Sequence, residues 1–308
     1  MITPLVAVAI PTYARKDLLT RMVDSIPVSW KVFVSDNASS LVPMERALGE
    51  NVVVSHSPTM VPMFANWNRA LSLVDSDCTH VFIPSDDDIF LPNALKTVSE
   101  ALVRHPEADI FVFGCDFLDG DDHTWKGYCP ERLETLAAGE GFLRFSTGVE
   151  ARMPGVLFRK VFLDRIGAFD ERFELTAADS DLVQRALLLG RSVFVPSVIG
   201  LYRIWPGSLT YAKQASDLWM NEVRLWTEKI MKLLVDEDRA NRLRINICQY
   251  QDEILAQNLL AGLNSLLTKG EHEKAQAFMS RHHIPARARL RTRLRLLRCK
   301  WKLRSFAR

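Results

Sequence analysis

The stretch His80-Val81-Phe82-Ile83-Pro84-Ser85-Asp86-Asp87-Asp88 joins an apolar run to three consecutive acids. Asp is a poor strand former and adjacent carboxylates repel one another, so this run is costly at the end of a buried strand unless a cation or hydrogen-bond donors compensate it. Oxygen-rich clusters suit Mg2+ or Mn2+, and open α/β sheets bind ligands at the carboxyl ends of their strands. The alternative is an acidic loop that leads into a helix after Pro92, with Asp88 near the amino end of that helix.

Strand-like and helix-like segments alternate up to about residue 200, which is the pattern of βαβ units. The predicted strands are 5–10, 31–35, 51–55, 80–84, 110–115 and 192–198, and the predicted helices are 17–26, 63–73, 94–104, 158–166 and 180–189. Long helical stripes at 219–234 and 254–267 follow. We therefore predict an α/β domain over 1–213, with a mostly parallel sheet flanked by helices, and a helical region over 214–308 that ends in a basic amphipathic tail.

The composition is that of a globular protein, with 48% apolar and 25% charged residues among 308. No apolar run reaches the length of a membrane span, and the first residues lack the basic segment of a signal peptide. The five cysteines are scattered without CxxC spacing, which argues against a disulfide framework and a zinc site. We expect a cytoplasmic location. Walker, Gly-x-Ser-x-Gly and GxGxxG patterns do not occur, which argues against P-loop, hydrolase and dinucleotide-binding classes.

Polar segments also follow the first two predicted strands. The first strand leads into Pro11-Thr12-Tyr13-Ala14-Arg15, and the second into Ser35-Asp36-Asn37. Either segment alone is compatible with a simple turn. In a parallel sheet, however, both would lie at the same edge as Asp86, Asp87 and Asp88.

Together these motifs resemble the family 2 glycosyltransferases of the GT-A fold, of the bacterial cell-surface glycan type, over roughly residues 5–210. The resemblance implies a nucleotide-sugar site in which Asp36 contacts the nucleobase and Asp86 the ribose. It implies a divalent cation, Mn2+ or Mg2+, held by Asp87 and Asp88. The residues that it implies in binding the nucleotide sugar are Pro11, Thr12, Tyr13, Arg15, Asp36, Asn68, Asp86 and Asp87.

The segment Ala178-Asp179-Ser180-Asp181 resembles the stretch that carries the family's catalytic carboxylate. The resemblance implies that Asp179 is the general base of a single displacement with inversion at the anomeric carbon. The alternative for Asp179 is an N-cap of the helix that starts at Ser180. Asp181 and Arg185 are expected to brace the site, and Arg203 either approaches the diphosphate or is a plain surface arginine.

Three positions depart from the family's pattern. Ser85 stands where the metal motif often has Asp, Ala178 where an acid usually precedes the base, and Trp205 where many relatives have His. Because Trp205 removes a possible metal or diphosphate contact, we expect weaker metal dependence. Two other functions stay open: a non-catalytic glycan-binding or assembly subunit that keeps the fold, and a sugar nucleotidyltransferase. The latter class opens with a Gly-rich basic loop, which residues 11–15 do not form.

The C-terminal tail is strongly basic. Residues 281–308 carry 11 Lys and Arg and no acid, which leaves 28 Lys and Arg against 37 acids in the rest of the chain. Leu290, Leu294, Leu297 and Trp301 share one helical face, as in an interfacial helix on anionic lipid. Packing against the acidic body is the alternative, and nucleic-acid binding lacks a motif. We expect peripheral attachment to the inner membrane face, a UDP- or dTDP-linked donor, and a glycan or lipid-linked acceptor.

Overall fold

The computed structural model describes residues 4–42, 48–175, 177–205 and 213–306, with the side chains of 304–306 left out. The chain forms two compact units. The first comprises Met1–Gly141, Glu150–Glu174 and Ala186–Trp205, and the second Phe142–Val149, Leu175–Arg185 and Pro206–Arg308. Part of the predicted α/β domain thus groups with the C-terminal helices, and the predicted boundary at 213 adjoins residues outside the description. Within the described residues, none of the helices combines the length and apolar character of a membrane span.

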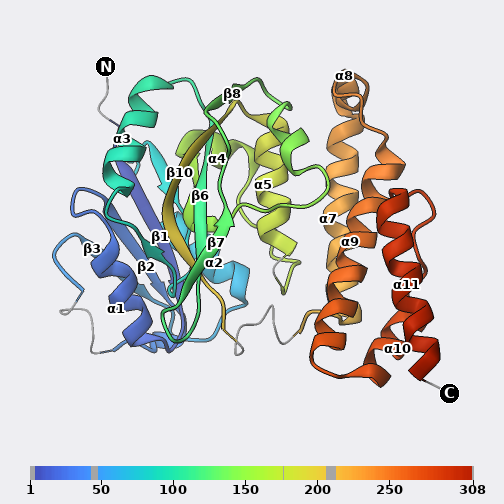
Figure 1. The fold of residues 1–308 in the computed structure, drawn as a ribbon. Helices are drawn as coiled ribbons and strands as arrows, with labels where there is room; N and C mark the ends of the chain where they lie inside the picture. Colours follow the sequence, from blue (N-terminus) through green and yellow to red (C-terminus); the bar gives the residue numbers. More distant parts are fainter. Residues whose placement is uncertain (1–3, 43–47, 176, 206–212, 307–308) are drawn as a thin grey trace. The chain divides into compact units, whose positions relative to one another are not determined.

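The first unit is built on a ten-stranded mixed sheet (Figure 1). Its strands are β1 (Val6–Thr12), β2 (Lys31–Asp36), β3 (Val52–His56), β4 (His80–Phe82), β5 (Ile89–Phe90), β6 (Ile110–Leu118), β7 (Thr124–Tyr128), β8 (Glu134–Leu136), β9 (Val156–Arg159) and β10 (Ser192–Arg203). The order is β3-β2-β1-β4-β9-β6-β10-β5, with β7 beside β6 and β8 beside β10. The pairs β3–β2, β2–β1, β1–β4 and β6–β10 are parallel. The predicted α/β class with a mostly parallel sheet is confirmed.

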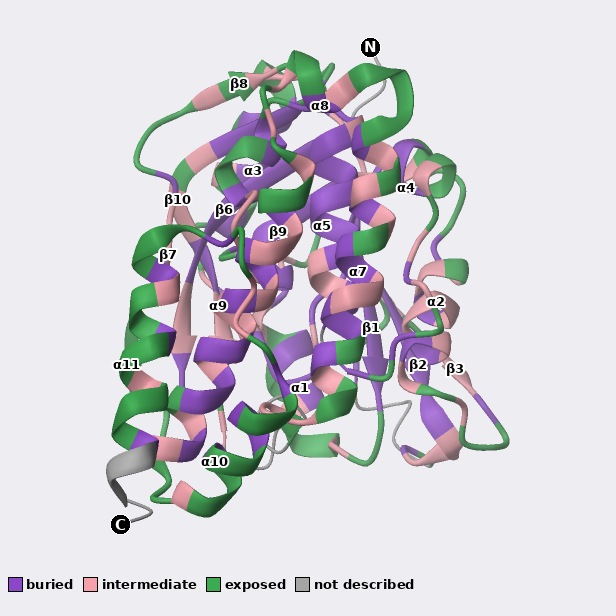
Figure 2. Ribbon diagram, turned by 90° about the vertical axis from the view of Figure 1, so that its right-hand side faces the viewer, coloured by how far each residue is buried: buried purple, intermediate pink, exposed green. Residues whose placement is uncertain are grey.

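Helices cover this sheet: α1 (Lys16–Ser25), α2 (Met63–Ser72), α3 (Ala94–Arg104) and α4 (Lys160–Ile166). Short 3-10 turns occur at Asn37–Ser39, Gly141–Phe145 and Met153–Gly155, and the helix α5 (Ala177–Leu189) is shared between the two units. Each covering helix buries one apolar stripe. In α1 that stripe is Leu19, Met22 and Val23, which packs in the same core as β1. Every residue of β1 is buried, and Figure 2 shows this strand and β2 largely in the colour of buried residues.

The second unit contains the helices α7 (Asp217–Val235), α8 (Arg239–Arg242), α9 (Ile247–Thr268), α10 (His272–Arg281) and α11 (Leu290–Phe306), with a 3-10 turn at Asp236–Asp238. Ser216 caps α7 by accepting the N–H of Trp219, and Asn246 caps α9 in the same way. A core of its own includes Leu260 and Leu263 of α9, Phe278 of α10 and Leu296 of α11.

Segment 156–159 differs from the prediction, which placed a helix over 158–166. Val156, Leu157 and Phe158 form β9, antiparallel to both β4 and β6, and the helix begins only at Lys160. The three side chains are fully buried inside the sheet. A short apolar run fits a buried strand and a buried helix equally well, so its neighbours in the sheet decide its conformation. The strands β5, β7 and β8 were not predicted either.

Candidate functional site

The carboxyl ends of β1, β2 and β4 bring three of the predicted polar segments together in the first unit. Thr12 at the end of β1 lies opposite Asp36 at the end of β2 in the parallel register. The Thr12 hydroxyl donates a hydrogen bond of 2.6 Å to Oδ2 of Asp86, just after β4. Thr12, Asp36 and Asp86 are all buried. The acidic turn, Asp86–Asp88, therefore lies at the edge of the sheet where the sequence predicts a ligand site.

Asp86 is held between two donors. Its Oδ2 accepts from Thr12, and its Oδ1 lies 3.1 Å from Nη1 of Arg15. Burial raises the pKa of Asp86 to about 6, the Arg15 charge opposes this rise, and the charge of Asp87 adds to it. Because the ionised form is favoured mainly by Arg15 and the Thr12 hydrogen bond, this carboxylate depends on a cationic neighbour.

Asp87 shares that cationic neighbour. Its Oδ2 lies 3.0 Å from the same Nη1 of Arg15. The guanidinium also lies over the ring of Trp205, 5.2 Å from the ring centroid. The side chain of Arg15 is 34% exposed, whereas those of Asp86 and Asp87 are 4% and 8% exposed. One partly exposed guanidinium thus bridges two buried carboxylates and stacks on an aromatic ring.

Asp88 points into the protein. Its Oδ2 accepts the N–H of Ser85 at 2.9 Å and its Oδ1 accepts the N–H of Arg203 at 3.3 Å. Burial first, and then the charge of Asp87, raise the pKa of Asp88 well above its ordinary value of 3.8. Both oxygens therefore serve to close the acidic turn and to join it to β10. The predicted ligand pair Asp87 and Asp88 stays a prediction, but these contacts favour Asp86 and Asp87 as the cation-binding pair.

Arg203 is a buried brace in this structure. Its Nε donates to the backbone oxygen of Asp87 at 3.0 Å, and its Nη1 to the backbone oxygen of Asp119 at 2.7 Å. A salt bridge of 3.3 Å joins it to Asp122. These bonds fix the acidic turn against the loop between β6 and β7. Of the two alternatives for Arg203, a plain surface arginine is wrong, because the side chain is 4% exposed; contact with a diphosphate stays a prediction.

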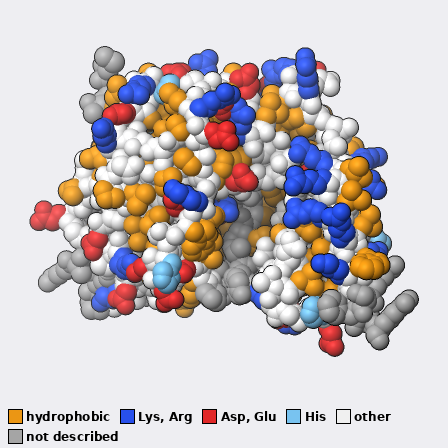
Figure 3. Space-filling view, in the orientation of Figure 1, with side chains coloured by type: hydrophobic (Ala, Val, Ile, Leu, Met, Phe, Trp, Pro, Cys, Tyr) orange, Lys and Arg blue, Asp and Glu red, His pale blue; other side chains and the backbone are white. Residues whose placement is uncertain are grey.

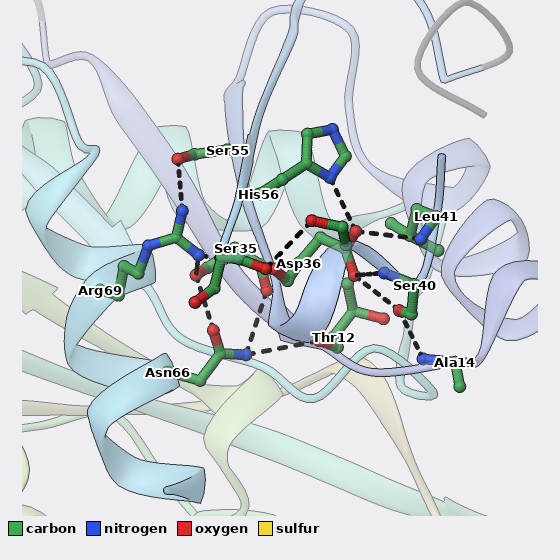
Figure 4. A network of polar contacts seen from close by, with 12 residues as sticks. Thr12, Ala14, Ser35, Asp36, Ser40, Leu41, Ser55, His56, Asn66 and Arg69 are labelled. Carbon is green, nitrogen blue, oxygen red and sulfur yellow. Dashed lines mark hydrogen bonds and ion pairs between the residues drawn. The ribbon is translucent and has the colours of Figure 1, made fainter. Parts of the chain in front are cut away.

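Asp36 lies at the centre of a second polar network, to which Thr12 also belongs through the amide of Asn66 (Figure 4). Its Oδ1 accepts from the N–H and hydroxyl of Ser40, and its Oδ2 from the N–H of Leu41 at 2.9 Å. Nδ1 of His56, at the end of β3, lies 2.7 Å from the same Oδ2. The Asp36 side chain has no exposed area. These contacts give Asp36 a positioning role for the 37–41 turn and for His56, and its predicted contact with a nucleobase stays untested.

Two asparagines of α2 have different tasks. Asn68, predicted to bind the nucleotide sugar, donates its amide to the oxygen of Phe169 at 2.9 Å and accepts the N–H of the same residue at 3.0 Å. It also donates to Glu171. Asn66, which was not singled out, accepts the hydroxyl of Ser35 at its Oδ1 and donates its amide to the backbone oxygen of Ser35, as Figure 4 shows. The spacing of two residues on a helix was the signal that the two amides face different neighbours.

Pro11 and Tyr13 flank Thr12 in contrasting environments. Pro11 is buried and pairs with Ser35 in the sheet register. Tyr13 is 50% exposed and precedes Ala14, whose φ of 53° turns the chain into α1. An exposed aromatic ring beside a buried acidic turn is available for stacking on a planar ligand group.

The predicted acceptor-side carboxylates belong to the second unit. Asp179 lies inside the first turn of α5, because the helix begins at Ala177 and not at Ser180. It is therefore not the N-cap, although a carboxylate in the first turn is favoured by the helix dipole. Asp181 has no exposed side-chain area and binds Arg185 at 2.9 Å and Lys229 at 2.8 Å. Asp181 and Arg185 thus brace α5 against α7.

A second group of potential metal ligands lies in the loop after β6. Oxygen and nitrogen ligand atoms of Asp119, Asp121 and His123 lie within 4.8 Å of one another. Oδ1 of Asp119 accepts the N–H groups of Asp121 and His123 at 2.9 Å. Asp121 and His123 are exposed. These bonds account for the geometry of the loop without a ligand.

The carboxylates of the acidic turn fit a divalent cation. Asp86 and Asp87 already direct one oxygen each toward a shared positive group, the Arg15 guanidinium. Carboxylate oxygens are the ligands that Mg2+ and Mn2+ prefer. The sequence analysis predicted that Arg15 binds the nucleotide sugar and did not foresee its contact with the acidic turn. The signal was charge complementarity between a lone arginine after β1 and three acids after β4.

Comparisons with known proteins show which fold and which family the chain has. The crystal structure of S. aureus TarS 1–349 in complex with UDP-GlcNAc aligns with a TM-score of 0.60 at 16% identity, over 98% of this chain and 90% of that chain. A longer S. aureus TarS structure gives 0.59 at 17% identity, over 97% of this chain and 53% of that one. The uncharacterized protein y4gI of Sinorhizobium fredii (strain NBRC 101917 / NGR234) is 23% identical over 227 residues, which are 69% of this chain and 24% of that relative's length.

The chain therefore spans about a quarter of the length of this curated relative and about half of the longer TarS structure. At these identities the structural likeness establishes the fold. The family is established separately, by a sequence model described as Glycosyl transferase family 2 that matches residues 7–166. Because this match covers just over half of the 308 residues and includes β1, β2, β4 and the acidic turn, the chain belongs to glycosyl transferase family 2.

Proposed function

We propose that the protein transfers a sugar from a nucleoside diphosphate donor to a hydroxyl of a glycan or lipid-linked glycan. The observation that carries this proposal is the acidic turn at the carboxyl end of β4, where buried Asp86 and Asp87 share a cation and are braced by Thr12 and Arg203. The negative charge of a donor diphosphate must be neutralised as the diphosphate leaves. Asp86 and Asp87, after β4, would hold the cation that neutralises it. TarS, which has the same fold, binds UDP-GlcNAc and UDP; this supports a uridine or thymidine diphosphate donor here.

The ligands of the proposed cation, Mn2+ or Mg2+, are Asp86 and Asp87. A bound divalent ion would supply Lewis-acid neutralisation of the diphosphate. Asp88 and Arg203 hold the two ligands in place from behind, through the backbone of the turn. Tyr13, which is 50% exposed and follows Thr12, is proposed to contact the donor.

The general base is proposed to be Asp179, in a single displacement that inverts the anomeric carbon. Its place in the first turn of α5, within the segment that resembles the family's catalytic stretch, supports this role. Asp181 is less suited, because Arg185 and Lys229 already neutralise it and it has no exposed area.

We propose a membrane-linked acceptor because one face of α11 is suited to binding a membrane. The helix packs into the protein with one face and exposes apolar side chains on the other. Leu296 and Leu303 are buried in the core of the second unit, whereas Leu290, Leu294, Leu297 and Trp301 are 69%, 46%, 49% and 72% exposed. At about 100° per residue, the exposed four form a narrow stripe opposite the buried pair. Basic residues border it on both sides: Arg291, Arg295 and Arg298 on one and Arg293 and Lys300 on the other. Figure 3 shows Lys and Arg side chains gathered over the C-terminal helices.

This arrangement suits the headgroup region of an anionic leaflet. Apolar side chains enter the boundary of the acyl chains, and each flanking cation contributes about 1 kcal/mol near an anionic surface. We therefore propose peripheral attachment of the protein to the inner face of the cell membrane through the exposed stripe. The packed face of α11 remains in the protein core.

The experiment is to incubate the protein with UDP- and dTDP-sugars, Mn2+ and a membrane glycan extract, and to measure release of the nucleoside diphosphate. Asp87→Asn is the matched control, because it removes one charge from the acidic turn and little volume. Release that depends on both the extract and Asp87 supports the proposal. Tight binding of glycan with no donor binding would instead favour an assembly subunit, and pyrophosphate release from a nucleoside triphosphate would favour a nucleotidyltransferase.

A further inference from the structure

The guanidinium of Arg15 lies on the two carboxylates that the proposed function assigns to the divalent ion. Nη1 contacts Oδ1 of Asp86 at 3.1 Å and Oδ2 of Asp87 at 3.0 Å. Two cations on one pair of buried carboxylates repel each other strongly, because the dielectric constant is low there. An ion that takes these oxygens must therefore displace Arg15.

The backbone of Arg15 is fixed, while its side chain is long enough to move. Its carbonyl accepts the N–H of Leu19 at 2.9 Å in the first turn of α1, and the preceding Ala14 is tied to Ser40 at 2.8 Å. The side chain is 34% exposed. The guanidinium can thus leave the acidic turn toward solvent or a ligand without unfolding of the helix.

Trp205 defines the resting place of this side chain. The guanidinium lies 5.2 Å from the centroid of the indole ring. An indole offers no metal ligand but attracts a cation to its face. Trp205 thus stabilises the Arg15 side chain over the carboxylates and does not supply a ligand to an ion.

We propose that Arg15 is a displaceable internal cation: it neutralises Asp86 and Asp87 in the absence of donor and moves to the donor diphosphate when an ion binds with it. The proposal rests on the proposed function. It explains how Asp86 and Asp87 are tolerated side by side in a buried turn before ligand binds, while the N–H groups of Ser85 and Arg203 compensate Asp88. It also makes ion binding dependent on the nucleotide, since the diphosphate gives the displaced guanidinium a new anionic partner.

The test is Mn2+ binding to the nucleotide-free protein, measured by electron paramagnetic resonance. Arg15→Gln is expected to bind Mn2+ about 10-fold more tightly than the wild type, because the competing cation is absent. Lys16→Gln is the matched control: it removes the same charge from the next residue, which is exposed on α1. It is expected to change the affinity less than about 2-fold. Trp205→Leu, which removes only the stacking partner, is expected to tighten Mn2+ binding about 2- to 5-fold.

The second measurement is UDP binding in the presence of saturating Mn2+, by calorimetry. Arg15→Gln is expected to weaken it about 10-fold or more, the opposite sign to its effect on the ion alone. Unchanged or weaker Mn2+ affinity in both Arg15→Gln and Trp205→Leu overturns the proposal for Arg15 and leaves the proposed function standing if UDP still binds with Mn2+. Absence of UDP binding in the folded wild type, with and without Mn2+, overturns the proposed function itself.

Discussion

The carboxylate of Glu253 in α9 accepts a hydrogen bond from the backbone N–H of Arg289 across 2.7 Å. Its other oxygen accepts the hydroxyl of Thr292 at 2.8 Å. Glu253 is buried, so these bonds attach the beginning of α11 to the N-terminal part of α9. The basic tail is therefore a packed element of the second unit, and the interior face and the exposed face of α11 have separate roles that different substitutions can probe.

The interior face is expected to contribute to stability. Leu296→Ala removes a fully buried side chain from the core that α9, α10 and α11 share, and should lower the free energy of unfolding by about 2–5 kcal/mol. Leu297→Ala, one residue along and 49% exposed, is the matched control and should cost less than about 1 kcal/mol. Chemical denaturation measures both. Equal losses for the two variants would mean that the faces of α11 are assigned wrongly.

The exposed face is expected to bind anionic membranes. The double variant Leu294→Ser/Trp301→Ser should weaken sedimentation with vesicles containing phosphatidylserine by 10-fold or more, with unchanged thermal stability. Val103→Ser/Val161→Ser removes two exposed apolar side chains from α3 and α4 and is the control. Wild-type binding should weaken with salt, since exposed charges are screened within about 8 Å at physiological ionic strength. Salt-independent sedimentation, or equal sedimentation of both variants, would contradict attachment through α11.

The acidic turn illustrates what sequence reasoning can reach. Three adjacent acids after an apolar run are too costly inside a strand, so the end of β4 and a cation nearby were predictable. The bond between Thr12 and Asp86 joins residues 74 positions apart, and no local pattern encodes such a pairing. For the same reason the inward direction of Asp88 could not be foreseen, because it depends on the N–H of Arg203.

The basic tail was predictable in part. Its exposed stripe follows from helical spacing, and the structure has these side chains exposed. The opposite face, with Leu296 and Leu303 among arginines, has too few apolar residues to signal burial by its own periodicity. Burial there is set by α9 and α10, which supply the rest of the core.

Asp87 and Asp88 are expected to respond differently to substitution. Asp87→Asn should keep the fold and abolish Mn2+-dependent UDP binding, because it removes a carboxylate that faces the shared cation. Asp88→Ala should cost about 1–3 kcal/mol of stability, because it leaves the N–H groups of Ser85 and Arg203 without their acceptor. Calorimetry and thermal melts separate the two effects. Loss of Mn2+-dependent binding in a stable Asp88 variant would return Asp88 to the ligand pair.

Asp179 and Asp181 should separate chemistry from structure. Asp179→Asn is expected to lower sugar transfer about 100-fold or more at unchanged donor affinity, as for a lost general base. Asp181→Asn should instead lower stability, because Arg185 and Lys229 lose the carboxylate that they share. Steady-state kinetics and denaturation curves of both variants make the comparison. A stable Asp181→Asn protein with the larger loss of turnover would move the base to Asp181.

His80, in β4 just before the acidic turn, should make stability depend on pH. Burial, and then the charge of Arg159, lower the pKa of His80 from its ordinary value of 6.5 to about 4. Between pH 6.5 and 4 the unfolded chain therefore binds a proton at His80 that the folded chain does not bind. The contribution of neutral His80 to the free energy of unfolding is complete above pH 6.5 and is lost as pH falls toward 4. The loss is on the order of 3 kcal/mol. Asp86 acts in the opposite direction, since its pKa is raised to about 6 in the folded state. Denaturation of the wild type and of His80→Gln, which share Asp86, isolates the histidine: the wild type should lose more stability than the variant between pH 6.5 and 4. Parallel stability curves for the two proteins would show that His80 is protonated in the folded chain without cost.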